Sequence, residues 1–471
     1  MQTADTAVNI TQELLPLPAG TGQEPSSWGA RHAHDPTVVQ DDDGIYYMFS
    51  TDAVANSKDI PAGVHIRTST DLVEWSYRGT ALDGVPEVAA TWSGAQGLWA
   101  PDVVRWPNGD WHMYYSASTF GSNTSAIGLA VAPSPAGPWE DRGLVVATRK
   151  GEHSQNAIDA AVTFDADGFP WLTYGSFFSG IYILPLDRNS GLPLVEGDLG
   201  SVIARRAKSV EGAVEGAFIL YRPEDGRYVL FCSYDSLFNS YNMRVGTAES
   251  ITGPYRDFRG NQLTDLAVPP ASVGTKVLGS YQFDGGTGWL APGHNSVLTR
   301  KAADGSTEYF AVHHVRFAED PSQHVVQLRR VFFTASGWPV VSPQPFAGAE
   351  RETLPASLPV AGSWQVLRFA PESADLVPAV AMQLECASPE QALSNGAPAQ
   401  VRLRATPPAV DGAVRADGAV NPHGDAEPDA GVELDAVVFG SWDWAAKRPA
   451  LSFSGIDQHG VAWSGTREGL L

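Results

Sequence analysis

The sequence predicts an all-β protein in which a five-bladed β-propeller is followed by a small C-terminal β-barrel or β-sandwich. Two observations predict this fold class. The 47 glycines and 34 prolines among 471 residues favour many tight turns between short strands over long helices. In addition, one hairpin pattern recurs five times at intervals of about sixty residues, which is typical of a repeat architecture such as a propeller.

Each copy of the pattern has an apolar and aromatic strand that follows a turn rich in Asp, Gly or Asn. The turns read DDDG, PNGD, DADG, PEDGR and ADGSTE, and turns of this composition join the two strands of a hairpin. The five strands are IYYMFS from Ile45, WHMYYSAS from Trp111, PWLTYGSF from Pro170, YVLFCSYD from Tyr228 and YFAVHHVRF from Tyr309.

Another apolar strand precedes each turn, and each of these strands opens with an ionisable residue. A single blade cannot bury both of its faces, so blades stack around an axis, and their innermost strands begin at one end of the central channel. We therefore expect four carboxylates and one imidazole to converge there, although each could instead be a turn cap on a separate strand. The five segments are HDPTVV (Asp35), APDVVRW (Asp102), IDAAVTF (Asp159), EGAFILY (Glu215) and GHNSVLT (His294).

The hairpin pattern also predicts the domain boundaries. Residues 1–27 form an N-terminal extension, residues 28–347 the propeller, and residues 348–471 a second all-β domain. The insert from Asp411 on is polar and is expected to be a mobile loop. Strands of the second domain are expected at Trp364 to Phe369, Val401 to Leu403, Glu433 to Phe439, Leu451 to Ser454 and Gly460 to Ser464.

Charge and cysteine content exclude several classes of protein. The net charge of -22 disfavours nucleic-acid partners and anionic membranes. Cys232 and Cys386 are too few for a disulfide scaffold or a thiolate metal cage. The first twenty residues lack the pattern of a signal peptide, so the protein is expected in the cytoplasm if the chain is complete, or outside the cell if a leader was removed. We expect a monomer.

Grouped carboxylates are suited to glycosidic bond cleavage. Burial and like charge raise the pKa of at least one of them, which places a proton donor beside an ionised acceptor. A separation of roughly 6.5–9.5 Å leaves room for a water molecule and inverts the anomeric configuration, whereas roughly 5–5.5 Å retains it. Placement on different blades favours the wider separation.

The chain resembles glycoside hydrolase family 43, and within it the endo-1,5-α-L-arabinanases. The later segment VFGSWDWAAKRPALSFSG (438–455) is similar to the β-barrel domain of the larger arabinanases. The segments that carry the resemblance are HAHDPTVV, GLWAPDVV (97–104), ASTFGSNTSAIGLA (117–130), NAIDAAVTFDADGFPWLTYGSFFSGI (156–181), VEGAFILY (214–221), APGHNSVL (291–298) and VFFTASGWPVVSP (331–343).

The resemblance implies roles for individual residues. Asp35 is the general base that orients the attacking water, Glu215 is the general acid, and Asp159 keeps Glu215 protonated and correctly aimed. The family inverts configuration. Glu211 is the rival for the acid because EGAVEGA repeats itself, but only Glu215 directly precedes the apolar strand.

The resemblance also implies ligand sites. His294 matches a histidine that holds a calcium ion on the propeller axis, and the alternative is a hydrogen-bonded histidine without a metal. No organic cofactor is expected. Residues expected to bind an arabinan or arabino-oligosaccharide substrate, or to hold its pocket, are His34, Trp99, Asp102, Phe120, Asn156, Ser176 and Arg316.

The chain departs from the family at a few positions, and other functions stay open. Ala160 and Ala217 replace prolines, and Leu237 and Phe238 stand where some relatives have paired cysteines. The alternatives are an exo-acting arabinosidase or xylosidase of the same family, or a non-catalytic sugar-binding propeller. The signatures of the fructan-cleaving five-bladed hydrolases are missing.

Overall fold

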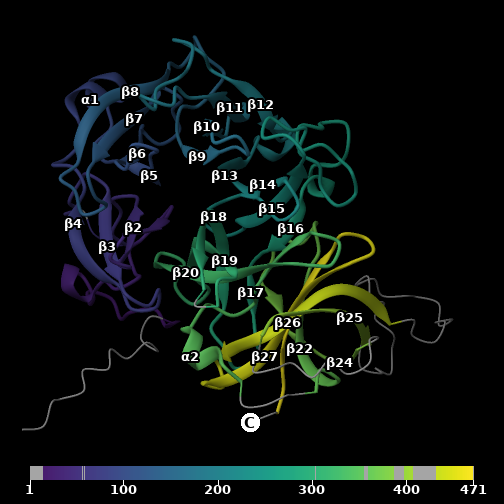
Figure 1. Cartoon of the computed structure of the whole chain (residues 1–471). Coiled ribbons are helices and arrows are strands. Elements are labelled where there is room, and N and C mark those ends of the chain that lie inside the picture. The colour runs from purple at the N-terminus through teal and green to yellow at the C-terminus, as the bar shows by residue number, and fades with distance from the viewer. Residues whose placement is uncertain are drawn as a thin grey trace, which may run out of the picture.

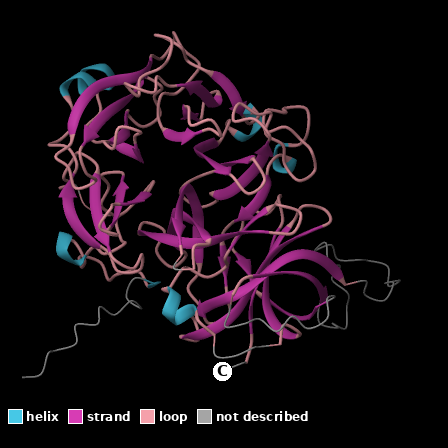
Figure 2. Cartoon of the chain, viewed as in Figure 1, coloured by secondary structure: helices cyan, strands magenta, loops and turns pink. Residues whose placement is uncertain are grey.

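The structure is a computed structural model that describes residues 14–55, 57, 59–302, 304–354, 359–386, 397–406 and 431–469. It confirms the predicted fold class: five antiparallel sheets surround an axis, and a closed β-barrel lies beside the fifth (Figure 1). Strands dominate throughout, as Figure 2 shows. Within the described ranges the helices are short, and none combines the length and apolar character needed to cross a membrane. The helical elements are η2 (Pro25–Ser27), α1 (Glu87–Ser93), η3 (Lys208–Val210), η4 (Pro270–Ser272) and α2 (Ala349–Glu352).

Blades 1 to 3 are consecutive four-stranded meanders, and each begins with its innermost strand. Blade 1 contains β1 (Thr37–Gln40), β2 (Tyr46–Ser50), β3 (His65–Ser69) and β4 (Ser76–Thr80). Blade 2 contains β5 (Trp99–Arg105), β6 (Trp111–Ala117), β7 (Ser125–Ala132) and β8 (Glu140–Thr148). Blade 3 contains β9 (Ala161–Phe164), β10 (Pro170–Ser176), β11 (Gly180–Pro185) and β12 (Ser201–Ala204).

Blades 4 and 5 complete the ring. Blade 4 contains β13 (Val214–Arg222), β14 (Arg227–Tyr234), β15 (Asn242–Ala248) and β16 (Thr275–Leu278). Blade 5 contains β18 (Trp289–Lys301), β19 (Thr307–Phe317), β20 (His324–Phe333) and β21 (Pro339–Val341), with β17 (Tyr281–Gln282) at its edge. The innermost strands contact each other in the order β1, β5, β9, β13, β18 and back to β1, so the ring is closed.

Burial explains why the five hairpins read as apolar in the sequence. Every residue of β2 and of β6 is buried, because a strand inside a stacked blade has neighbouring blades on both faces. Such a strand shows a continuous apolar run in place of strict alternation.

The innermost strands share a backbone feature that the sequence did not indicate. One residue at the start of each has a left-handed conformation: Asp35 (φ 52°), Ala100 (φ 39°), Asp159 (φ 59°), Gly216 (φ 57°) and His294 (φ 49°). Asp and His tolerate this region better than most residues, and strained backbone of this kind collects at functional sites. At Gly216 a Cβ would lie 2.9 Å from the Cα of His294, so only glycine fits there.

This backbone alignment corrects the prediction that the five ionisable residues occupy the same place. Asp35, Asp159 and His294 do occupy the left-handed position of their blades. Glu215 precedes that position by one residue, and Asp102 follows it by two. An offset of one residue turns a side chain to the opposite side of the strand, and an offset of two moves it along the strand to another level of the channel.

The C-terminal region forms a closed barrel with its own apolar core. Its strands follow the order β22 (Gly362–Phe369), β24 (Val380–Cys386), β25 (Ala399–Thr406), β26 (Val432–Asp443), β27 (Arg448–Asp457) and β28 (Ala462–Arg467). The barrel confirms the predicted second all-β region, but β24 was missed because only Met382 and Leu384 carry its apolar alternation. The insert expected from Asp411 on lies outside the described residues.

Several contacts join the barrel to the propeller. The short strand β23 (Val377–Pro378) pairs in parallel with β17 of blade 5. The hydroxyl of Ser454 donates a hydrogen bond to the carbonyl of Val341 at 2.7 Å. Because one strand from beyond residue 347 adds to a propeller sheet, the domain boundary at that residue stays a prediction.

Candidate active site

A cavity of about 770 Å³ opens at the end of the channel where the innermost strands begin. This volume is in the range of small-molecule binding sites. Nine of the eleven residues expected from the sequence line it, and eight of these are His34, Asp35, Trp99, Phe120, Asn156, Asp159, Ser176 and Glu215. His294 lines it as well, whereas Asp102 and Arg316 do not.

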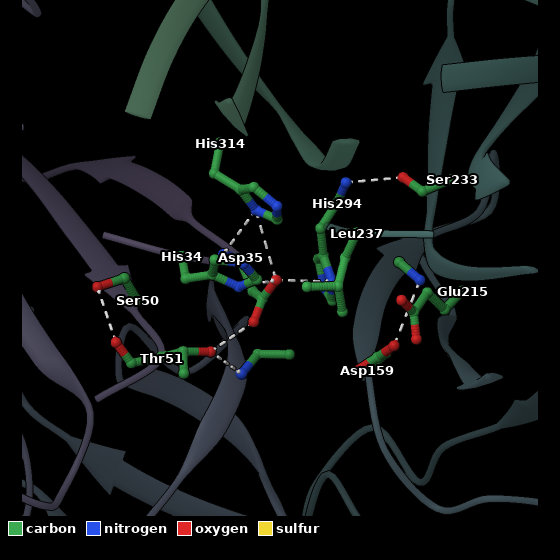
Figure 3. Close-up of polar contacts among 12 residues, drawn as sticks. His34, Asp35, Ser50, Thr51, Asp159, Glu215, Ser233, Leu237, His294 and His314 are labelled. Atoms are coloured by element: carbon green, nitrogen blue, oxygen red, sulfur yellow. Dashed lines mark hydrogen bonds and ion pairs between the residues drawn. The ribbon is translucent and has the colours of Figure 1, made fainter. Parts of the chain in front are cut away.

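Asp35 is held by partners from blades 1 and 5. Its Oδ1 lies 2.8 Å from Nδ1 of His34 and 3.0 Å from Nδ1 of His294, and its Oδ2 accepts a 2.6 Å hydrogen bond from the hydroxyl of Thr51. Figure 3 shows these contacts around the carboxylate. A carboxylate offers about four lone-pair sites, so three direct partners leave one for a further donor such as a water molecule.

The charges around Asp35 keep it ionised. Burial would raise the pKa of Asp35, but the positive charges and hydrogen bonds of His294 and His34 hold it well below its usual range. Burial lowers the pKa of His294, but the negative charges of Asp35, Asp159 and Glu215 outweigh it and raise that pKa to about 10. Asp35 and His294 therefore form an ion pair within the cavity.

His314 supports this arrangement from blade 5. Its ring stacks on His34 with centroids 3.6 Å apart, and its Nδ1 accepts a 3.3 Å hydrogen bond from the backbone N–H of Asp35. Burial, with the charge of His34, lowers the pKa of His314 well below its usual value, so the ring is neutral. Nδ1 also lies 3.6 Å from Oδ1 of Asp35, but a nitrogen that accepts the backbone proton cannot donate to that oxygen.

Glu215 and Asp159 lie on the other side of His294 from Asp35 in Figure 3. Glu215 is buried, and its two carboxylate oxygens accept hydrogen bonds from Ser176 at 2.7 Å and from Tyr241 at 2.6 Å. Burial and the charge of Glu215 raise the pKa of the Tyr241 phenol well above its usual value, so the phenol keeps the proton that it donates. These two contacts fix the orientation of the Glu215 side chain.

The environment of Asp159 favours its protonated form. Burial, with the negative charges of Glu215 and Asp35, raises the pKa of Asp159 to about 8 against the opposing charge of His294. The resemblance assigned the proton to Glu215 and a negative charge to Asp159. Asp159 therefore holds a proton near neutral pH.

Asp102 and Arg316 do not line the large cavity. Asp102 is buried away from the large cavity, where Oδ1 accepts a hydrogen bond from Thr37 at 3.2 Å and Oδ2 accepts one from the backbone N–H of Val162 at 2.7 Å. It thus joins blades 1, 2 and 3. Arg316 is also buried, and it donates to the carbonyls of Leu237 at 2.8 Å and Pro321 at 2.7 Å.

The remaining expected residues lie at the cavity wall or rim. Asn156 is buried, and its Oδ1 accepts a hydrogen bond from Ser125. Phe120 is 79% exposed at the mouth. Glu211, the rival for the acid, is exposed at the rim of the cavity.

Sequence reasoning missed Thr51, Tyr241 and His314. A signal for Thr51 was present, because the second strand of several blades ends in a polar residue that lines the cavity. These residues are Thr51, Ser118, Ser176 and Asp235, which end the runs YYMFST, YYSAS, YGS and CSYD. Tyr241 and His314 carry no such mark, because they look like ordinary core aromatics.

The same second strands fix the left-handed positions of the next blade. The backbone N–H of Ala100 donates to Thr51 at 2.9 Å, that of Asp159 to Ser116 at 2.9 Å, and that of His294 to Ser233 at 2.7 Å. Ala100, Asp159 and His294 are therefore each positioned by the preceding blade. The geometry of the site thus depends on closure of the ring.

The donor atoms around His294 are suited to a cation. A smaller cavity shares Asp35, Asp159 and His294 with the large one and also touches Asp102 and Asn295. The Oδ1 atom of Asn295 is buried and has no hydrogen-bond partner among the described residues. Carboxylate and amide oxygens are the ligands that calcium prefers. Possible ligand atoms also lie within 4.8 Å of one another in His34, Asp35 and His314. However, Nδ1 of His314 already accepts a hydrogen bond from the backbone N–H of Asp35.

Comparison with known proteins agrees with this site. The family described as glycosyl hydrolases family 43 matches residues 29–339. The chain is 29% identical over 390 residues to extracellular endo-α-(1→5)-L-arabinanase 2 of Bacillus subtilis (strain 168), which covers 74% of this chain and 79% of that protein. It is 30% identical over 329 residues to extracellular exo-α-(1→5)-L-arabinofuranosidase ArbA of Cellvibrio japonicus (strain Ueda107), covering 65% of this chain and 86% of that protein.

A solved structure extends the similarity to both parts of the chain. The endo-1,5-α-L-arabinanase from Thermotoga petrophila RKU-1 matches with a TM-score of 0.75 and 25% identity, covering 95% of this chain and 100% of that chain. The family match spans the propeller that carries Asp35, Asp159 and Glu215. The chain therefore belongs to glycosyl hydrolases family 43.

Proposed function

We propose that the protein hydrolyses α-1,5-linked L-arabinofuranosidic bonds of arabinan with inversion of configuration. One observation carries the proposal: Asp35 from blade 1 and Glu215 from blade 4 both line the cavity, and His294 lies between them in Figure 3. Inverting glycosidases need a base and an acid on opposite sides of the scissile bond, with room for a water molecule.

The proposed reaction is a single displacement. Asp35 accepts a proton from a water molecule while the water oxygen attacks the anomeric carbon. The bond from that carbon to the departing sugar oxygen breaks, and Glu215 gives that oxygen a proton. Asp159 shares this proton with Glu215 and acts as a positioning residue, while Thr51 and Tyr241 hold the base and the acid in place.

The sugar contacts follow from the cavity wall. Trp99 and Phe120 offer apolar ring faces, while His34, Asn156 and Ser176 offer polar atoms. The relatives named above act on α-(1→5)-linked arabinan, one as an endo-enzyme and one as an exo-enzyme. We propose endo action, because the similar solved structure that spans both parts of this chain is an endo-1,5-α-L-arabinanase. Both named relatives are extracellular, and we propose the same location for this protein, as a monomer.

The test is the size and anomeric form of the first products. Linear arabinan should yield a spread of oligosaccharides, and proton NMR should detect the β-anomer before mutarotation. Release of one short product alone would indicate the exo-enzyme, and release of xylose from xylan would indicate the xylosidase. A protein that binds arabinan without any product would be the sugar-binding propeller, and an initial α-anomer would overturn the inverting mechanism.

Activity should fall on the alkaline side of neutral pH. Asp159 must hold the proton that it shares with Glu215, and the pKa of Asp159 is raised to about 8, so the active form is lost as pH rises through that value. We expect kcat/KM to drop about tenfold per pH unit above about 8. Asp35 stays ionised throughout, since its pKa is held well below the usual range. The measurement is a pH profile of kcat/KM, and a limb that stays in place in Asp159→Asn would contradict this assignment.

We further propose that His294 holds a calcium ion near the axis, with Asn295 close by, and that the ion displaces the proton that His294 carries in its ion pair with Asp35. Bound calcium would supply positive charge that stabilises the surrounding carboxylates. Dialysis against a chelator should lower the Tm, because an ion at one hundred times its Kd stabilises the folded state by about 2.7 kcal/mol. Calorimetry with and without calcium measures this, and His294→Ala should lose the response. Equal Tm values for the wild-type protein under both conditions would contradict the site.

A further inference from the structure

Three blades carry an exposed phenylalanine on equivalent loops. Phe120 lies between β6 and β7, Phe178 between β10 and β11, and Phe238 between β14 and β15. Their exposed fractions are 79%, 47% and 54%, and all three line the large cavity. Exposed apolar side chains that gather at one cavity mark a binding surface.

Two of these rings meet over the mouth of the cavity. The ring centroids of Phe120 and Phe238 are 6.5 Å apart, and the rings are inclined by 60° in an edge-to-face contact. Phe120 belongs to blade 2 and Phe238 to blade 4, which are not neighbours in the propeller. Because blade 3 lies between them, the contact must pass across the end of the channel. The side chain of Leu237 lines the same cavity.

The loop that carries Leu237 and Phe238 is firmly anchored. The buried Arg316 donates to the carbonyl of Leu237, and its guanidinium carbon lies 5.4 Å from the centre of the Phe238 ring. At the end of the loop, Tyr241 donates to Glu215 at 2.6 Å. Arg316, expected to touch the substrate, thus holds the loop. The position of Phe238 is therefore fixed relative to the acid Glu215.

We propose that Phe238, together with Phe120 and Leu237, forms an apolar roof over the cavity and determines how wide a polysaccharide chain can enter. This inference rests on the proposed arabinan hydrolysis. The C–H face of a furanose ring can pack against the phenyl rings. Phe238 shares its loop with the residue that holds Glu215, so it contacts the departing side of the chain. A sugar that carries a branch there is excluded by the contact between the two rings.

The test compares linear arabinan with arabinan that carries single arabinosyl branches. Phe238→Ala should lower kcat/KM on linear arabinohexaose roughly tenfold, mainly through KM, because an apolar contact with the sugar is lost. The same change opens the roof, so the ratio of kcat/KM on branched to linear polymer should rise several-fold. Phe238→Tyr keeps the ring and should retain the wild-type ratio.

The control is Phe169→Ala. Phe169 is similarly exposed, at 53%, but it lies on the turn between β9 and β10 and does not line the cavity. It should leave both rates unchanged. If Phe238→Ala lowers kcat/KM on both substrates by the same factor, so that their ratio stays at the wild-type value, the proposed role of the roof is contradicted. If the wild-type protein cleaves neither substrate, the proposed function itself fails, which is a separate result.

Discussion

Glu215→Gln is expected to lower kcat/KM on linear arabinan by about 10²–10⁴-fold, since this is the contribution of general acid assistance. The amide keeps the size of the side chain but cannot supply a proton to the departing oxygen. The fold and the KM should change little, because one hydroxyl can still donate to the amide oxygen while the oxygen of the other can accept from the amide N–H. Initial rates over a range of substrate concentration measure the effect.

The chemistry of the leaving group makes this test specific. An arabino-oligosaccharide glycoside of dinitrophenol departs without protonation, so Glu215→Gln should hydrolyse it at nearly the wild-type rate. Glu211→Gln is the matched control, because Glu211 lies on the rim of the same cavity and is exposed. A large loss in Glu211→Gln, or an equal loss of Glu215→Gln on both substrates, would falsify the assignment of the acid.

Asp35→Ala is expected to reduce kcat by a similar factor of about 10²–10⁴, because the attacking water loses its proton acceptor. Added azide should restore part of the rate, since an azide ion needs no deprotonation and fits the space that the carboxylate leaves. The product should be a glycosyl azide of inverted, β configuration. Mass spectrometry and NMR identify it.

A second aspartate separates catalysis from stability. Asp102 accepts hydrogen bonds from Thr37 and Val162 inside the channel. Asp102→Ala leaves the buried backbone N–H of Val162 and the hydroxyl of Thr37 without their acceptor, so it should lower the stability of the fold by about 1–3 kcal/mol. Its main effect should be on Tm.

If Asp35→Ala retained most of its activity, or azide gave the retained product, the role of Asp35 as base would be excluded.

Much of this site was predictable from the sequence. The hairpin repeat indicated five blades, and the ionisable residues ahead of the innermost strands pointed to Asp35, Asp159, Glu215 and His294 as cavity residues. This works because a blade buries both faces of its strands, so a polar residue at such a position is conspicuous in an apolar run. Trp99, at the start of β5, and the loop residue Phe120 came from the resemblance, and both line the cavity.

Only the tertiary structure decided the level and partners of each side chain. A left-handed residue lies near the start of every innermost strand. Asp35, Asp159 and His294 occupy this position, whereas Glu215 and Asp102 are shifted from it by one and two residues. Spacing in the sequence cannot reveal backbone dihedral angles, so the hydrogen bonds by which Asp102 joins neighbouring blades could not be foreseen. The position of Arg316 was hidden for a related reason: its partner Leu237 lies on another blade.

The sequence by itself determined the architecture, the family and the acidic character of the channel, because these follow from apolar periodicity and residue type along the chain. The structure decided which carboxylate is ionised and which holds the proton. Those properties depend on burial and on charges brought together from different blades: His294 beside Asp35, and Glu215 near Asp159. Ring closure creates these pairs, and no local stretch of the chain contains them.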